Sequence, residues 1–269
     1  MRFSAEQTFF YSRVATLITG VGAITAAAAG SQGVPFWHVP LAFCAWLALG
    51  CLNFPHKTSL WMLVHRRVPF LAFYGALAGS FFLVDTLALR LELWFYPFYA
   101  GWWVVLVYGL LYPAAALAGL ELFLLVARRL YGVPVLKESV NTAVHTAISR
   151  GEGALFLLMM FLIASGAAGY RVLIGVLFIV LIAWMAASGV ALGSHFARTA
   201  QLAVLIFTAA AAAFAIGSPG YAPFERLYSE ASVLTAPLLS IPIWIWVGSL
   251  WFVFFTFRLW VHLVQHARR

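Results

Sequence analysis

Long runs of apolar residues alternate along the chain with short segments that carry most of its charges. A helix of about twenty apolar residues crosses the hydrocarbon core of a bilayer, so each run predicts a transmembrane helix. The runs, delimited by charges and by Pro and Gly, cover residues 9–30, 35–53, 68–89, 101–127, 153–169, 172–194, 199–217 and 236–260. The pattern therefore predicts an all-α, polytopic bundle of about eight transmembrane helices.

The basic residues give this bundle an orientation, because Lys and Arg are enriched in cytoplasmic loops. With the N-terminus inside, 13 of the 16 Lys and Arg residues fall in cytoplasmic segments, and only Arg90, Arg171 and Arg226 fall outside. We therefore expect both termini to be cytoplasmic. A signal peptide over residues 1–30 is a competing interpretation, but Glu6 and Arg13 interrupt the regions that such a peptide needs.

The longest polar stretch, residues 128–153, carries apolar residues at helical spacing and predicts a cytoplasmic interfacial helix. It divides the chain into a first four-helix half, residues 1–127, and a second half, residues 154–269, with the same orientation. These halves could be an internal repeat or a coincidence of loop lengths. The third and sixth predicted helices carry Gly-x-x-x-Gly spacings, Gly75 to Gly79 and Gly189 to Gly193, which favours an interior position for both.

The composition agrees with this fold class and excludes others. Hydrophobic residues make up 64% of the chain and charged residues 9%, which excludes a soluble domain. The net charge of +8 follows from the membrane topology, so nucleic acid is not expected as a partner. The abundance of Ala and Arg is typical of a GC-rich bacterial genome, and we expect a multi-pass protein of the bacterial inner membrane. Membrane lipid is the expected partner, and no protein partner is indicated.

Few acidic side chains lie at or near membrane depth, where a charge is costly and is retained mainly for function. Asp85, Glu92, Glu225 and Glu230 gather on the outer side with Arg90 and Arg226. Aromatic residues follow the first two acids: Trp94, Tyr96, Tyr99, Trp102 and Trp103. A solvated rim of ion pairs with an interfacial aromatic belt would explain this pattern without a ligand.

The same residues also suit a second interpretation. A carboxylic acid kept neutral in an apolar site, beside aromatic rings that stabilise positive charge, can protonate an alkene or an epoxide. On this hypothesis Asp85 and Glu92 are the acids, while Arg90 and the aromatic residues line a pocket for a hydrophobic small molecule. Glu121, the deepest carboxylate, is a weaker third candidate. A helix-to-helix hydrogen bond or an interaction with Arg128 is the alternative role for Glu121.

The order of several of these residues resembles the small membrane carotenoid and terpenoid cyclases over about forty residues. Asp85 is followed by Leu93-Trp94 and Tyr96-Pro97, and then by a helix with Pro113 and Leu120-Glu121-Leu122-Phe123. The family has an acid, a short outer segment with Trp, and a helix with proline and glutamate before Phe. Its compact Pro-x-Glu-Glu cluster has no counterpart here. The resemblance implies an isoprenoid substrate and a cyclase, hydratase or isomerase reaction.

The histidines, the cysteines and the overall helix pattern were also considered as signs of a metal site, a disulfide or a non-enzymatic function. His262 and His266 form one H-x-x-x-H pair, but no H-x-x-H-H box is present, so we expect neither a di-iron site nor a haem, and no other metal or cofactor. Cys44 and Cys51 lie two helical turns apart and are expected to pack as free thiols. A non-catalytic membrane subunit or a small-solute or lipid carrier remains the rival function.

Overall fold

The protein is predominantly helical. The structure, a computed structural model, describes residues 5–32, 34, 37–90, 94–95, 107–131, 142–165, 176, 179–180, 183–184, 187, 227–228, 237–238, 241–242, 251–252 and 255–260. Its helices in this part of the chain are α1 (Ala5–Ser31), α2 (His38–Asn53), the 3-10 turn η1 (Phe54–His56), α3 (Ser59–His65), α4 (Arg67–Arg90), the π-helical turn η2 (Val107–Leu111), α6 (Tyr112–Tyr131) and α7 (Thr142–Ser165). Residues 251–252 and 255–260 are also helical.

Within the described residues, four helical segments are long and apolar enough to cross a membrane: Ser12–Gly30, His38–His56, Arg67–Arg90 and Gly109–Val126. The ends of these segments agree to within three residues with the ends of the first four predicted spans, apart from the start of the fourth. The fourth span was expected to start at residue 101, and residues 101–106 lie outside the described residues. These helices indicate a membrane protein. The predicted sixth span has only scattered described residues, and the seventh, at 199–217, lies outside them.

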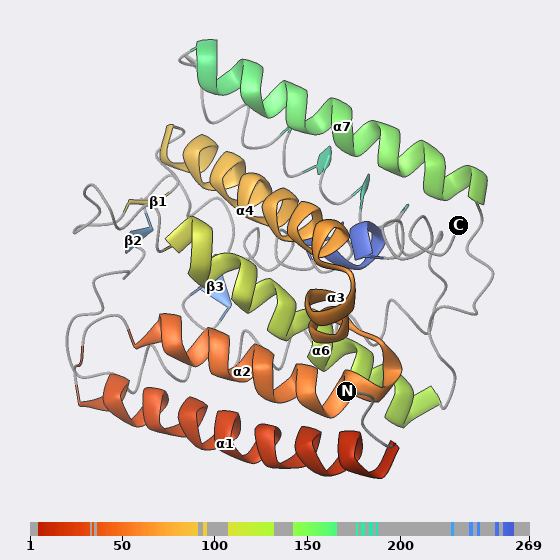
Figure 1. The fold of residues 1–269 in the computed structure, drawn as a ribbon. Helices are drawn as coiled ribbons and strands as arrows, with labels where there is room; N and C mark the ends of the chain where they lie inside the picture. Colours follow the sequence, from red (N-terminus) through yellow and green to blue (C-terminus); the bar gives the residue numbers. More distant parts are fainter. Residues whose placement is uncertain are drawn as a thin grey trace.

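The helices pack in an order that differs from their order in the chain. Figure 1 shows α1 at one edge beside α2, then α6 and α4, with α7 at the opposite edge. The buried core lies between α4, α6 and the helical residues near the C-terminus. Phe73 contacts Trp260 with ring centroids 5.9 Å apart, and Phe123 contacts Phe257 at 5.4 Å. The last described helix therefore packs against the centre of the bundle.

Hydroxyl groups within the membrane-crossing helices bond to their own backbone. The side chains of Thr16 and Thr19 donate to carbonyl oxygens four residues earlier at 2.7 Å, Thr25 does so at 2.9 Å, and Ser80 at 2.7 Å. Such bonds satisfy polar groups that lipid cannot bond. These helices can therefore face lipid despite their Ser and Thr residues.

Two predicted helix boundaries need correction. Helix α7 runs without a break from Thr142 to Ser165, so the predicted interfacial helix and fifth span meet in one helix rather than dividing at residue 153. The predicted eighth span begins too early, because β3 (Pro237–Leu238) pairs with β4 (Ile241–Pro242) as an antiparallel hairpin. Pro242 has no N–H to donate and would interrupt a helix there.

The Gly-x-x-x-Gly pair of α4 does not mark a buried contact. Gly75 and Gly79 are both exposed, and no heavy atom of the described residues lies within 4 Å of where a Cβ would stand. The glycine pair is therefore not a packing contact, although α4 itself packs against α6 and α7, with Phe73 and Leu77 fully buried. Gly189 and Gly193 lie outside the described residues.

A short strand pair connects two segments that lie far apart in the chain. The strand β1 (Trp94–Phe95) pairs antiparallel with β2 (Leu227–Tyr228), with Trp94 opposite Tyr228. Residues 94–95 and 227–228 therefore lie side by side.

Candidate functional site

Asp85 is a buried carboxyl group on the fourth helix. Only 3% of the residue is exposed, and the hydroxyl of Tyr112, the first residue of α6, donates to Asp85 Oδ2 over 3.4 Å. The acid therefore lies where the second half of α4 meets the beginning of α6.

A series of aromatic rings in contact with one another begins at Tyr112, the hydrogen-bond partner of Asp85. Phe81, one helical turn before Asp85, lies 4.9 Å from the Tyr112 ring, measured between centroids. Its other neighbour is Phe252, whose ring stacks on it at 4.0 Å with an interplanar angle of 17°. Phe252 in turn meets Trp251 edge-on at 5.3 Å. Asp85 thus adjoins an aromatic cluster contributed by α4, α6 and the C-terminal helix.

The π-helical turn η2 shapes the same region. Pro113 has no N–H, so the carbonyl of Gly109 loses the partner that a regular helix would give it. The hydroxyl of Tyr74, on α4, donates to that carbonyl oxygen over 2.7 Å. The carbonyl that Pro113 leaves without a helical partner is therefore bonded by a side chain of the neighbouring helix.

Glu121 occupies a different and fully buried place, with 0% of the residue exposed. Its Oε2 accepts a bond from the Asn53 amide at 2.7 Å. Its Oε1 accepts from the backbone N–H of Ser59 at 2.8 Å and also from the Ser59 hydroxyl. Each of these partners is a donor, so the carboxylate acts here as an acceptor.

Neighbouring groups fix the direction of these bonds. The Trp46 indole N–H donates to Ser59 Oγ over 2.9 Å, which leaves the Ser59 hydroxyl hydrogen for Glu121. The Asn53 amide nitrogen also donates to the Glu121 backbone carbonyl at 2.8 Å, and the Asn53 amide oxygen accepts from Arg128.

Burial, and then the charge of Arg129, lower the pKa of Arg128, although a guanidinium stays protonated near neutral pH.

We call this group of Asn53, Ser59, Glu121 and Arg128 the Glu121 clamp. Asn53 and Ser59 stand at the two ends of the connection between α2 and α3, and both bond to one carboxylate on α6. Since a buried carboxylate with several donors is costly to disturb, the clamp holds this connection against α6.

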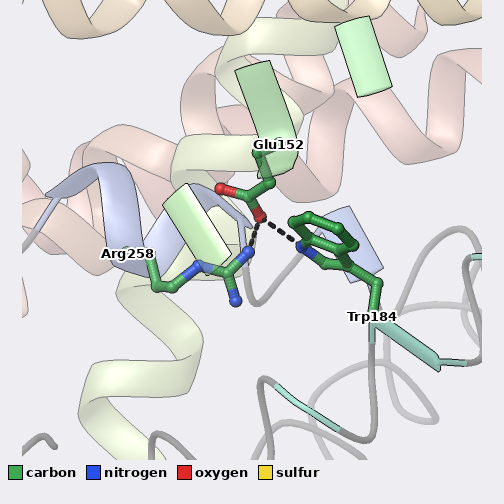
Figure 2. A network of polar contacts seen from close by, with 3 residues as sticks. All are labelled: Glu152, Trp184 and Arg258. Atoms are coloured by element: carbon green, nitrogen blue, oxygen red, sulfur yellow. Dashed lines mark hydrogen bonds and ion pairs between the residues drawn. The ribbon is translucent and has the colours of Figure 1, made fainter. Parts of the chain in front are cut away.

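A third buried carboxyl group, that of Glu152, forms an ion pair. Figure 2 shows Glu152 of α7 between Arg258 and Trp184, and both partners reach the same oxygen, Oε1. The Trp184 indole N–H donates over 3.0 Å. Arg258 is 2% exposed and Glu152 is 6% exposed. This ion pair joins α7 to the C-terminal helix inside the protein.

The structure separates residues that the sequence had grouped by chemistry. Tyr112, the partner of Asp85, and Glu121 are nine residues apart on α6, about 13 Å along the helix axis, so Asp85 and Glu121 belong to different sites. Arg90 is exposed at the end of α4, and Trp94 lies in β1. Glu92, Tyr96, Tyr99, Trp102 and Trp103 lie outside the described residues.

Sequence reasoning missed Asn53, Ser59 and Tyr112 as partners of the acids. An Asn near the end of an apolar run was the one available signal, because a polar side chain at that depth needs a partner. Among the residues that the structure describes, no group of three or more His, Cys, Asp or Glu side chains could hold a metal ion. Cys44 and Cys51 are free thiols.

Comparison of the chain with protein families, with characterised proteins and with solved structures gives no match. The three buried carboxyl groups and their partners are therefore the features of this chain that point to a function.

Proposed function

We propose that this protein is an integral-membrane enzyme that acts on a lipid-soluble, isoprenoid- or carotenoid-like substrate by acid catalysis within the membrane. The observation that carries the proposal is the position of Asp85, a buried carboxyl group on a membrane-crossing helix beside the rings of Phe81, Tyr112 and Phe252. An ionisable side chain at such a depth is a candidate for function.

The proposed reaction is of the cyclase, hydratase or isomerase type. Asp85 would transfer a proton to one carbon of a substrate alkene, which leaves a carbocation on its neighbour. Aromatic faces stabilise such a cation, and an apolar site keeps water from it. In a cyclisation or isomerisation, loss of a proton from the cation forms a new alkene. In a hydration, one water molecule admitted to the site adds to the cation and then loses a proton. None of these reactions needs an oxidant or a reductant.

The other candidate residues take different parts in this proposal. Glu92 is the second acid, and Arg90, Trp94, Tyr96, Tyr99, Trp102 and Trp103 line the outer part of the substrate site. Trp94 supports this arrangement because β1 begins only four residues after the end of α4. Glu121 is reassigned from a catalytic acid to a structural acceptor, because its carboxylate oxygens accept bonds from Asn53 and Ser59.

The proposed setting is the bacterial inner membrane. The chain would cross it about eight times with both termini cytoplasmic, in two four-helix halves at residues 1–127 and 154–269 joined by residues 128–153. The distribution of Lys and Arg in the sequence supports this orientation.

The test is a comparison of Asp85→Asn with the wild type in a host that makes carotenoids. Chromatography and mass spectrometry of extracted lipids should show a product with the wild type and none with Asp85→Asn, at equal amounts of protein in the membrane. Glu121→Gln serves as the matched control, since it changes a carboxylate outside the proposed site and should leave some product. Undiminished product from Asp85→Asn would remove this residue from the mechanism.

One observation favours the rival function, a non-catalytic membrane subunit or a carrier. Glu121 and Glu152 both bond to partners that hold helices together, so most of the buried carboxylates with described side chains have structural roles. On this hypothesis Asp85 is a third structural contact. Asp85→Asn would then leave the lipid profile unchanged and would lower only the thermal stability.

A further inference from the structure

A cluster of basic and aromatic side chains, which we call the basic patch, lies on α3 and its two ends. Lys57 Nζ lies 5.8 Å from the centre of the Trp61 ring, and the Arg66 guanidinium carbon lies 6.0 Å from it. His65 stacks on the same ring with centroids 4.7 Å apart. Trp61 therefore holds two cations close together through cation–π attraction.

The patch lies at the level of a membrane surface. It connects two segments that are apolar enough to cross the bilayer, His38–His56 and Arg67–Arg90. Lys57 and His65 are exposed. Trp, Lys and Arg are the residues that anchor a membrane protein at its lipid headgroups.

Exposed apolar side chains continue from the patch along the chain into α4. Val64 is 52% exposed, Val68 is 79% exposed and Leu71 is 62% exposed. Such side chains would contact the acyl chains of a lipid while the cations contact its headgroup. A soluble anion would gain nothing from these apolar neighbours.

The backbone of the patch is held in an unusual conformation. Lys57 has φ 58° and ψ 47°, and it is the one residue other than glycine with positive φ in the described part of the chain. A side chain in the left-handed region is disfavoured unless its surroundings fix it. The Glu121 clamp does so, because it bonds Asn53 and Ser59 on either side of this turn.

We propose that the basic patch is a binding site for the phosphate headgroup of an anionic phospholipid from the surrounding membrane. Lys57 and Arg66 contact the phosphate, Trp61 lies at the level of the glycerol, and Val64, Val68 and Leu71 contact the acyl chains. Glu121 is a positioning residue for this site. The proposal does not depend on the enzymatic function proposed above.

The experiment measures which lipids stay bound to the protein. The full chain is reconstituted into phosphatidylcholine nanodiscs that contain a minor share of phosphatidylglycerol, released in mild detergent and analysed by native mass spectrometry. The wild type should retain phosphatidylglycerol in preference to phosphatidylcholine. Each removed charge should lower this retention about fivefold, so Lys57→Gln/Arg66→Gln should lose most of it.

Lys57→Gly separates lipid binding from folding. Glycine adopts the left-handed conformation without strain, so this variant should unfold at the same temperature as the wild type or a higher one, yet retain less phosphatidylglycerol. Arg150→Gln removes one exposed charge from α7, outside the patch, and is the matched control that should keep the lipid. Equal retention by Lys57→Gly and Arg150→Gln would overturn the proposal. Displacement of the lipid by inorganic phosphate alone would also overturn it, because the site would then serve a soluble anion.

Discussion

Ser59 and Glu121 lie 62 residues apart in the chain and are joined by two hydrogen bonds to one oxygen. The backbone N–H of Ser59 and its hydroxyl both donate to Glu121 Oε1, the former over 2.8 Å. The first residue of α3 is thereby bonded to the middle of α6. These bonds match the helix-to-helix hydrogen bond that the sequence offered as the alternative role for Glu121, and we expect a structural role for this carboxylate.

Removal of this acceptor should destabilise the protein. Glu121→Leu leaves the Ser59 N–H and the Asn53 amide without a carboxylate, and each buried donor without an acceptor costs roughly 1–3 kcal/mol. Glu121→Gln keeps one oxygen and should lose less stability. A thiol-reactive dye can follow thermal unfolding in detergent, since Cys51 is buried and free. Unchanged unfolding of Glu121→Leu would show that the clamp contributes nothing.

Tyr74 and Pro113 should be energetically coupled through the carbonyl of Gly109. Tyr74→Phe leaves this carbonyl without its 2.7 Å bond, which should cost about 1–3 kcal/mol. Pro113→Ala restores a backbone N–H that can bond to the same oxygen, so Tyr74→Phe should cost much less in that background. Thermal unfolding of both single variants and of the double variant measures the coupling. Strictly additive losses would contradict the assignment.

The buried pair of Glu152 and Arg258 should be more costly to break than to replace. Arg258→Met leaves Glu152 charged and buried with the Trp184 N–H, and removal of one partner from such a pair costs about 3–5 kcal/mol. The double variant Glu152→Leu/Arg258→Met removes both charges and should be closer to the wild type in stability. Denaturation of the three variants tests this order. A double variant less stable than Arg258→Met would refute it.

Two glycine substitutions should have opposite effects. A Cβ built on Gly151 would lie 2.2 Å from the Trp184 ring, so Gly151→Ala must displace this ring and should cost about 1–3 kcal/mol. Gly75→Ala meets open space on α4 and should stabilise the helix by up to about 1 kcal/mol. Melting temperatures of the two variants, measured side by side, give the comparison. Loss of stability in Gly75→Ala would mean that a helix packs on this face after all.

The hydrophobic pattern was sufficient to predict the first helices because the length of a membrane span depends on bilayer thickness alone. The segments Ser12–Gly30 and Arg67–Arg90 follow from the runs at 9–30 and 68–89. The hairpin at residues 237–242 was missed because apolar residues around Pro237 and Pro242 looked like the start of a span.

The partners of the acids could not be predicted, because no local rule relates residues on different helices. Asn53 reaches Glu121 across 68 residues, and Tyr112 reaches Asp85 across 27. The continuity of α7 through Gly151 and Glu152 was missed for a related reason. Trp184 packs against Gly151 and Arg258 pairs with the buried Glu152, whereas the sequence alone shows a glycine and a charge of the kind that ends a span.

The order of the clamp residues along the chain bears on how the protein is made. Synthesis from the N-terminus delivers α2 and α3 to the membrane before α6. When Glu121 leaves the translocation channel, Asn53 and Ser59 are already present to accept it into the bilayer. We therefore expect the early helices to assist the insertion of a later helix whose buried carboxylate would be costly to insert by itself.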